Sequence, residues 1–196
     1  MKVLRLAPAT RRAQLLEVGR SIFTERPYDD FSMDQVADLA GVSKALLFHY
    51  FPTKRDFYAA VLEEAVGEML ALTEPEPGAT SEEQLQIGLE RYLDYVSSHS
   101  PAYVAVLRGG VGADPKIAGI AEGFRQAMLD RISTALGLDA PAPAQRVAVR
   151  GWIGMVEAAS LDWIEHGDMA RADLVQLLVA AFTWVVELAG IEPPQR

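Results

Sequence analysis

Apolar residues recur at spacings of three and four along nearly the whole chain, and no segment sustains the two-residue alternation typical of a strand. Two proline-rich segments, at residues 73–80 and 137–143, interrupt this pattern and are typical of loops. The pattern predicts longer helices at residues 11–24, 53–72, 81–98, 114–136, 144–165 and 171–189. Shorter helices are expected between residues 32 and 52 and after Ser100. We therefore expect an all-α fold of about nine helices, without internal repeats.

Residues 31–52 have the features of two short helices joined by a tight turn. Ser32 and Ser43 are each placed to cap a helix, because a serine oxygen can accept a hydrogen bond from an unpaired backbone N–H. Gly41 tolerates the left-handed backbone of a sharp helix end, and Pro52 stops the second helix. A helix-turn-helix of this kind can place its second helix in the major groove of DNA.

The same stretch resembles the TetR-type bacterial transcriptional regulators, over roughly residues 10–58. The resemblance is carried by Phe31-Ser32-Met33, Val36-Ala37, Ala40-Gly41-Val42-Ser43-Lys44, Leu47-Phe48-His49-Tyr50-Phe51-Pro52 and Thr53-Lys54. It implies a three-helix DNA-binding domain at residues 1–52 and a larger helical domain at residues 53–196 that dimerises and often binds an inducer. Leu46 and Phe48 depart from the family pattern, which often has Thr and Tyr there, and each change removes a hydroxyl that can contact phosphate.

Residues on and around the second motif helix are expected to contact DNA. Lys44 and His49 can hydrogen-bond to base edges, and the small Ala45 allows close approach or contact with a thymine methyl. Phosphate contacts, which position the helix without reading sequence, are expected from Ser32, Ser43, Tyr50, Thr53 and Lys54. The predicted DNA-contacting residues are Ser32, Ser43, Lys44, Ala45, Leu46, Phe48, His49, Tyr50, Thr53 and Lys54.

The charge distribution changes the first impression given by the net charge of −9. Residues 1–58 contain nine Lys and Arg against seven Asp and Glu, whereas the rest of the chain contains nine against twenty. Because DNA is attracted by the local face and not by the sum over the chain, the acidic total does not exclude a DNA partner.

The last two predicted helices have the composition of a pairing surface. The first is rich in small residues, which allow close helix approach, and the second is apolar nearly all round, so it must be buried on several sides. An isologous homodimer provides that cover, and burial inside the subunit's own core is the alternative. The predicted interface residues are Gly151, Gly154, Ala158, Leu161, Leu178, Phe182 and Val185.

Aromatic, methionine and a few polar side chains spread over several helices suggest an effector pocket, since such pockets are mostly apolar with few polar groups. The candidate ligand-binding residues are Tyr92, Tyr95, Tyr103, Arg108, Phe124, Met128, Trp152, Met155, Glu157 and Trp163. The alternative is that these residues are ordinary core positions.

No pattern in the sequence supports catalysis, a cofactor or a metal. There is no cysteine, and His49, His99 and His166 are too far apart in sequence to suggest a metal site. The glycine-rich residues 109–112 lack the strand and the Gly-Lys-Ser of a phosphate loop, so we expect a helix-breaking bend there. No nucleophile-elbow signature is present. With no apolar run near the roughly 20 residues of a membrane span and no signal core, we expect a cytoplasmic protein without membrane contact.

The sequence therefore predicts a homodimeric transcriptional regulator, a repressor that a small-molecule ligand releases from a palindromic operator in double-stranded DNA. Two alternatives remain. One is a DNA-binding regulator with no small-molecule effector. The other is a helical sensor or enzyme whose N-terminal domain no longer reads DNA.

Overall fold

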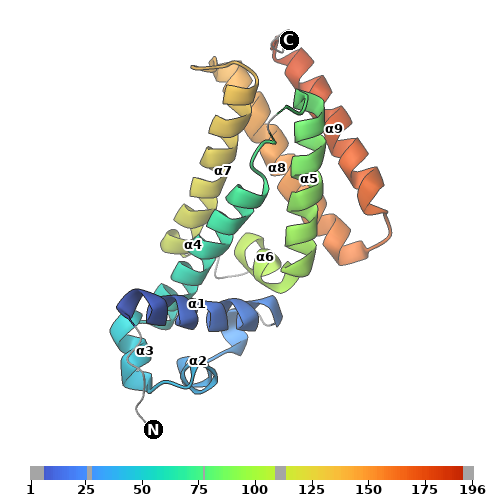
Figure 1. Cartoon of the computed structure of the whole chain (residues 1–196). Coiled ribbons are helices and arrows are strands. Elements are labelled where there is room, and N and C mark those ends of the chain that lie inside the picture. Colours follow the sequence, from blue (N-terminus) through green and yellow to red (C-terminus); the bar gives the residue numbers. More distant parts are fainter. Residues whose placement is uncertain (1–6, 26–27, 77, 109–113, 192–196) are drawn as a thin grey trace. The chain divides into compact units, whose positions relative to one another are not determined.

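The computed structural model describes residues 7–25, 28–76, 78–108 and 114–191, and this part of the chain is all helical (Figure 1). Its elements are α1 (Pro8–Glu25), η1 (Tyr28–Asp30), α2 (Met33–Ala40), α3 (Lys44–Tyr50), α4 (Lys54–Leu72), α5 (Ser81–Ser98), α6 (Ser100–Leu107), α7 (Pro115–Ala135), α8 (Pro143–His166) and α9 (Arg171–Leu188). The all-α prediction is confirmed, and the predicted helix ends differ from these by only a few residues. The bend expected at residues 109–112 lies outside the described residues.

The chain forms two compact units. The first, unit 1, consists of Met1–Gly67 and His99–Ile120, and the second, unit 2, of Glu68–Ser98 and Ala121–Arg196. Helices α4 and α7 contribute residues to both units. The domain boundary after residue 52 stays a prediction.

Unit 1 is built around a cluster of aromatic rings from α1, from α4 and from Phe31, which lies just before α2. Phe23 packs against Phe31 and Tyr58, with ring centroids 4.7 Å apart in each pair. At Gly19 the helices α1 and α4 approach so closely that a Cβ atom there would lie 2.6 Å from atoms of Phe57 and Val61. The absence of a side chain at this position therefore sets how closely the helix after the motif packs against α1.

Unit 2 packs α5, α7, α8 and α9 around a core that includes Leu93 and Leu178, both fully buried. Trp152 fastens α8 to α9, because its indole Nε1–H donates to the Leu178 carbonyl at 3.0 Å. Its ring also lies edge-on to Phe182 at 4.7 Å. An indole that is 96% removed from solvent needs such a partner for its N–H, so this bond fixes the register of the two helices.

Candidate DNA-binding and effector sites

The first helix of the motif, α2, begins and ends as the sequence predicts. Ser32 caps it through a reciprocal pair of bonds: the Gln35 N–H donates to Ser32 Oγ at 3.3 Å, and the Ser32 N–H donates to Gln35 Oε1 at 2.9 Å. Gly41 ends the helix with φ 63° and ψ 36°, the left-handed conformation that favours glycine. The roles predicted for Ser32 and Gly41 in the turn are confirmed.

The second motif helix, α3, is anchored on one side and open on the other. Ser43 caps it by accepting from the Leu46 N–H at 3.2 Å, and Leu47 is fully buried in the unit 1 core. Lys44, Ala45 and His49 are exposed, whereas Leu46, Phe48 and Tyr50 are half-buried. The buried leucine thus orients the helix so that the residues predicted to read bases face solvent.

Lys44 already has a partner on α2. Its Nζ lies 2.7 Å from Asp34 Oδ1, and both side chains are 61% exposed. An exposed pair of this kind contributes about 0–1 kcal/mol, whereas a good contact to a base edge contributes about 1–3 kcal/mol. The pair therefore does not prevent Lys44 from turning to DNA.

Two residues predicted to contact phosphate, Thr53 and Lys54, also have roles inside unit 1. The Thr53 hydroxyl accepts from the Asp56 N–H at 3.0 Å and donates to Asp56 Oδ2 at 2.7 Å, which caps the start of α4. The Lys54 ammonium lies 4.3 Å from the Phe31 ring centroid and 4.5 Å from that of Tyr28, a cation–π geometry. Their phosphate contacts stay predictions.

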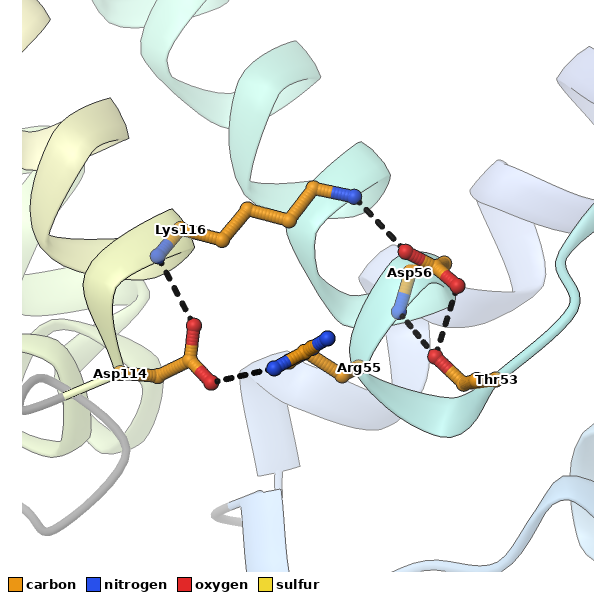
Figure 2. A network of polar contacts seen from close by, with 5 residues as sticks. All are labelled: Thr53, Arg55, Asp56, Asp114 and Lys116. Carbon is orange, nitrogen blue, oxygen red and sulfur yellow. Dashed lines mark hydrogen bonds and ion pairs between the residues drawn. The ribbon is translucent and has the colours of Figure 1, made fainter.

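A polar network in unit 1 joins the first turn of α4 to the start of α7 (Figure 2). Arg55 Nη1 lies 3.2 Å from Asp114 Oδ2, and Lys116 Nζ lies 2.8 Å from Asp56 Oδ1. Asp114 also caps α7, because its Oδ1 accepts from the Lys116 N–H at 2.9 Å. The Lys116 ammonium, followed by the Thr53 hydroxyl, lowers the pKa of Asp56. The Lys116 backbone N–H, followed by Arg55, lowers the pKa of Asp114.

This network is absent from the sequence-based expectations. The sequence offers one signal for it, since Asp114 directly precedes Pro115 and an aspartate before a proline often opens a helix. Nothing in the sequence pairs Arg55 with a residue so far along the chain.

A pocket in unit 2 encloses about 920 Å³, counted out to its open mouth. It is lined by residues of α5, α7, α8 and α9 and of the loop after α4, and most of the lining is apolar. Five of the ten candidate ligand-binding residues line it, namely Tyr92, Phe124, Met128, Trp152 and Glu157. The rings of Tyr92 and Phe124 lie nearly parallel, 6.5 Å apart.

The other five candidates do not line this pocket. Tyr95 is buried with its hydroxyl 3.4 Å from Glu68 Oε2, and the indole of Trp163 donates to the Met169 carbonyl at 2.8 Å. Met155 is 38% exposed on α8. Tyr103 and Arg108 belong to unit 1.

Apart from Glu157, the polar residues of the pocket are absent from the predicted set, and the most important of them is Arg131. Its Nη1 donates to the carbonyls of Leu70 and Thr73 and to Thr73 Oγ1, each at 3.0 Å. Arg131 follows Phe124 and Met128 at helical spacing on α7, and this spacing is the signal that places it on the same face.

Glu157, the second charged residue of the pocket lining, is paired. Arg125 Nε donates to both of its carboxylate oxygens, at 2.8 and 3.0 Å. Partial burial acts to lower the pKa of Arg125, but the bonds to Glu157 outweigh it and the pKa is raised. The carboxylate charge is thereby neutralised locally.

The residues predicted for dimerisation differ in their exposure. Gly151, Gly154 and Ala158 are exposed on α8, whereas Leu161 and Leu178 are buried within the subunit. Phe182 lines the pocket, and Val185 is half-buried. The large exposed apolar side chains of these helices are instead Val147 at 61%, Met155 at 38%, Leu177 at 50%, Trp184 at 63% and Leu188 at 68%.

Two kinds of feature are missing from the part of the chain that the structure describes. No helix there is long and apolar enough to span a bilayer. No three side chains of the His, Asp and Glu types lie close enough together in that part of the chain to hold a metal ion.

Comparison with known families decides the identity of this architecture. Residues 15–61 match the family described as "Bacterial regulatory proteins, tetR family", and residues 81–185 match "Tetracyclin repressor-like, C-terminal domain". The second match alone spans more than half of the chain. The chain belongs to the TetR family. This TetR-family protein is a transcriptional regulator that carries a DNA-binding helix-turn-helix, and the sequence-based expectation of family and fold is confirmed.

Known proteins are similar to this TetR-family chain over most of its length. The HTH-type transcriptional activator FasR of Mycolicibacterium smegmatis is 27% identical over 186 residues, which is 92% of this chain and 84% of FasR. A tetR-family regulator from Streptomyces coelicolor has 29% identity and a TM-score of 0.87, over 94% of this chain and 84% of the other. FadR of Bacillus subtilis, solved with stearoyl-CoA, has a TM-score of 0.66 at 18% identity, over 89% and 97% of the two chains. At that identity the likeness to FadR shows the fold alone.

Proposed function

We propose that this TetR-family regulator is a homodimer that binds a palindromic operator in the cytoplasm and acts as a repressor released by a small apolar ligand. The pocket of unit 2 is the observation that carries the proposal. Its mostly apolar lining with a few polar groups is typical of small-molecule sites. We propose regulation without catalysis.

The apolar lining favours a ligand rich in hydrocarbon. Leu85, Leu89, Ile132 and Val156 contribute aliphatic walls, in addition to the aromatic rings of the predicted residues. Burying a hydrocarbon chain against such walls contributes about 0.8 kcal/mol per CH₂ group. FadR of Bacillus subtilis, which shares the fold, was solved with stearoyl-CoA, a ligand of this hydrocarbon-rich kind.

The outer face of α8 and α9 supports the homodimer. A Cβ added at Gly151 or Gly154 meets nothing within 4 Å, so packing inside the subunit does not require glycine at either position. Exposed side chains such as Trp184 and Leu188 add an apolar area that a partner helix can cover. Together they give a surface that a second copy can approach closely.

Gly154→Arg tests the dimer directly, because the new side chain has room within the subunit. We expect the variant to sediment as a folded monomer at micromolar concentration and to lose operator affinity. Gly123→Arg is the matched control, since Gly123 is also exposed on a helix with nothing within 4 Å of an added Cβ. A Gly154→Arg variant that stays dimeric would contradict an interface on this face.

Operator reading is tested by selection from a randomised duplex pool, followed by fluorescence anisotropy at two salt concentrations. A palindromic consensus whose affinity falls as salt rises supports a dimer that reads two half-sites. Weak binding without sequence preference would instead support the alternative in which the N-terminal domain no longer reads DNA.

Activation is a second candidate, and the likeness to the activator FasR over 92% of this chain favours it. Both candidates use the same DNA-bound dimer, and they differ in where the operator lies relative to the promoter. Transcription in vitro from the selected operator distinguishes them, because added protein lowers the transcript in one case and raises it in the other.

A further inference from the structure

The two charged side chains that line the pocket of unit 2 differ in how their charges are balanced. Glu157 is held by Arg125 through two short bonds to its carboxylate. Arg131 forms no ion pair with any described residue, and its hydrogen bonds go to two carbonyls and one hydroxyl, all uncharged. The pocket therefore presents one cation whose charge is balanced only by neutral dipoles.

The free part of the Arg131 guanidinium is the part suited to a ligand. Its bonds within the described chain all use Nη1, which leaves the Nε–H and Nη2–H donors for another acceptor. A guanidinium offers these donors in a planar fork that matches a carboxylate. A charged hydrogen bond of this kind is about twice as strong as a neutral one.

The surroundings of Arg131 define the rest of the ligand. Met128, Ile132 and Ala135 lie near it on α7, Leu136 directly follows that helix, and all four line the pocket. A hydrocarbon chain whose head group is bound at Arg131 therefore has apolar walls beside it.

We propose that Arg131 recognises the effector, and that the effector is a hydrocarbon chain with an anionic head group, such as a carboxylate. This inference rests on the proposed function, since it takes the pocket to be the effector site. It also gives the ligand a route to α4. The same guanidinium holds the carbonyls of Leu70 and Thr73 at the C-terminal end of that helix, so a head group bound by Arg131 acts on the contact that secures this end.

Isothermal titration calorimetry of the full chain with dodecanoate and with 1-dodecanol tests the proposal. The two probes have the same chain length and differ in the head group. We expect dodecanoate to bind at least about 10-fold more tightly, in line with a charged hydrogen bond. In Arg131→Met the preference is lost, while the affinity for 1-dodecanol stays within about twofold. Arg150→Met, which changes a unit 2 arginine outside the pocket lining, keeps the preference.

Arg131→Lys covers the case in which Arg131→Met fails to fold, because lysine keeps the charge but loses the fork. We expect it to bind dodecanoate more weakly than the unchanged protein and 1-dodecanol equally well. The ratio of the two affinities is the decisive quantity, since a purely structural arginine affects both probes alike. If the unchanged protein binds both probes equally well, or if both variants keep the preference for dodecanoate, Arg131 does not recognise the head group. Either outcome would contradict the role of Arg131 but not the assignment of the pocket as the effector site. Binding of neither probe overturns the apolar effector pocket and this inference with it.

Discussion

Arg55 and Asp114, 59 residues apart in the chain, are joined by a bond of 3.2 Å between Nη1 and Oδ2. Together with the pair formed by Asp56 and Lys116, it fastens the start of α4 to the start of α7 inside unit 1 (Figure 2). Because α4 begins directly after the motif, this network secures the helix that follows α3, the second helix of the motif.

Reversing one charge in this network is expected to weaken DNA binding more than it weakens the fold. In Lys116→Glu the new carboxylate lies opposite the carboxylate of Asp56. Because both side chains are partly exposed, we expect the free energy of unfolding to fall by only about 1 kcal/mol. Adding Asp56→Lys restores opposite charges and should recover much of the operator affinity. Urea unfolding and fluorescence anisotropy measure the two effects, with Arg146→Glu on α8 as the control. If Asp56→Lys does not restore the operator affinity lost in Lys116→Glu, the ion pair is not what supports DNA binding.

The ion pair between Asp34 and Lys44 is expected to restrain DNA binding. Asp34→Asn removes a carboxylate that competes for Lys44 and repels phosphate, so operator affinity should rise by about 2- to 10-fold. Lys44→Ala should lower affinity by about 1–3 kcal/mol if the lysine contacts a base edge. Anisotropy over a salt series separates the two roles of Lys44, because loss of a phosphate contact reduces the salt slope by about one. Unchanged affinity in both variants would place Lys44 away from the DNA.

Gly19 is expected to tolerate no larger residue. In Gly19→Ala the new Cβ must displace Phe57 and Val61, both buried, and such overpacking costs about 1–3 kcal/mol. Gly67→Ala on α4 is the matched control, since nothing lies within 4 Å of an added Cβ there and alanine favours helix by up to about 1 kcal/mol. Urea unfolding should shift in opposite directions for the two variants. A Gly19→Ala protein that is more stable than the unchanged protein would mean that Phe57 and Val61 can move aside at little cost in free energy.

Local sequence signals were enough to predict the helices and the turn of the motif. They were not enough to predict contacts between segments that lie far apart in the chain. Ser32, Gly41 and Ser43 act through residues a few positions away, so their types and spacing predict what the structure shows. Trp163 and Met155 have the same chemistry as pocket residues, but which face of α8 they occupy depends on packing against other helices. The exposed Trp184 and the buried Leu178 both belong to the apolar pattern of α9, and the sequence does not distinguish them.

Tyr58 has a buried hydroxyl that is expected to lower the stability of the fold at alkaline pH. Its hydroxyl makes no hydrogen bond within the described chain, and burial, followed by the nearby Tyr28, raises its pKa to about 12. Because the folded pKa lies above the unfolded value of 10.0, stability is complete below pH 10 and falls by about 1.4 kcal/mol per pH unit between about 10 and 12. Tyr58→Phe removes the unpaired hydroxyl, so the unfolding free energy at pH 7 should be unchanged or about 1 kcal/mol higher. The loss above pH 10 should also be smaller than in the unchanged protein. Urea unfolding at pH 7, 10 and 11 measures both effects, with the half-buried Tyr50→Phe as the control. A Tyr58→Phe protein less stable at pH 7 would show that the hydroxyl has a partner in solution.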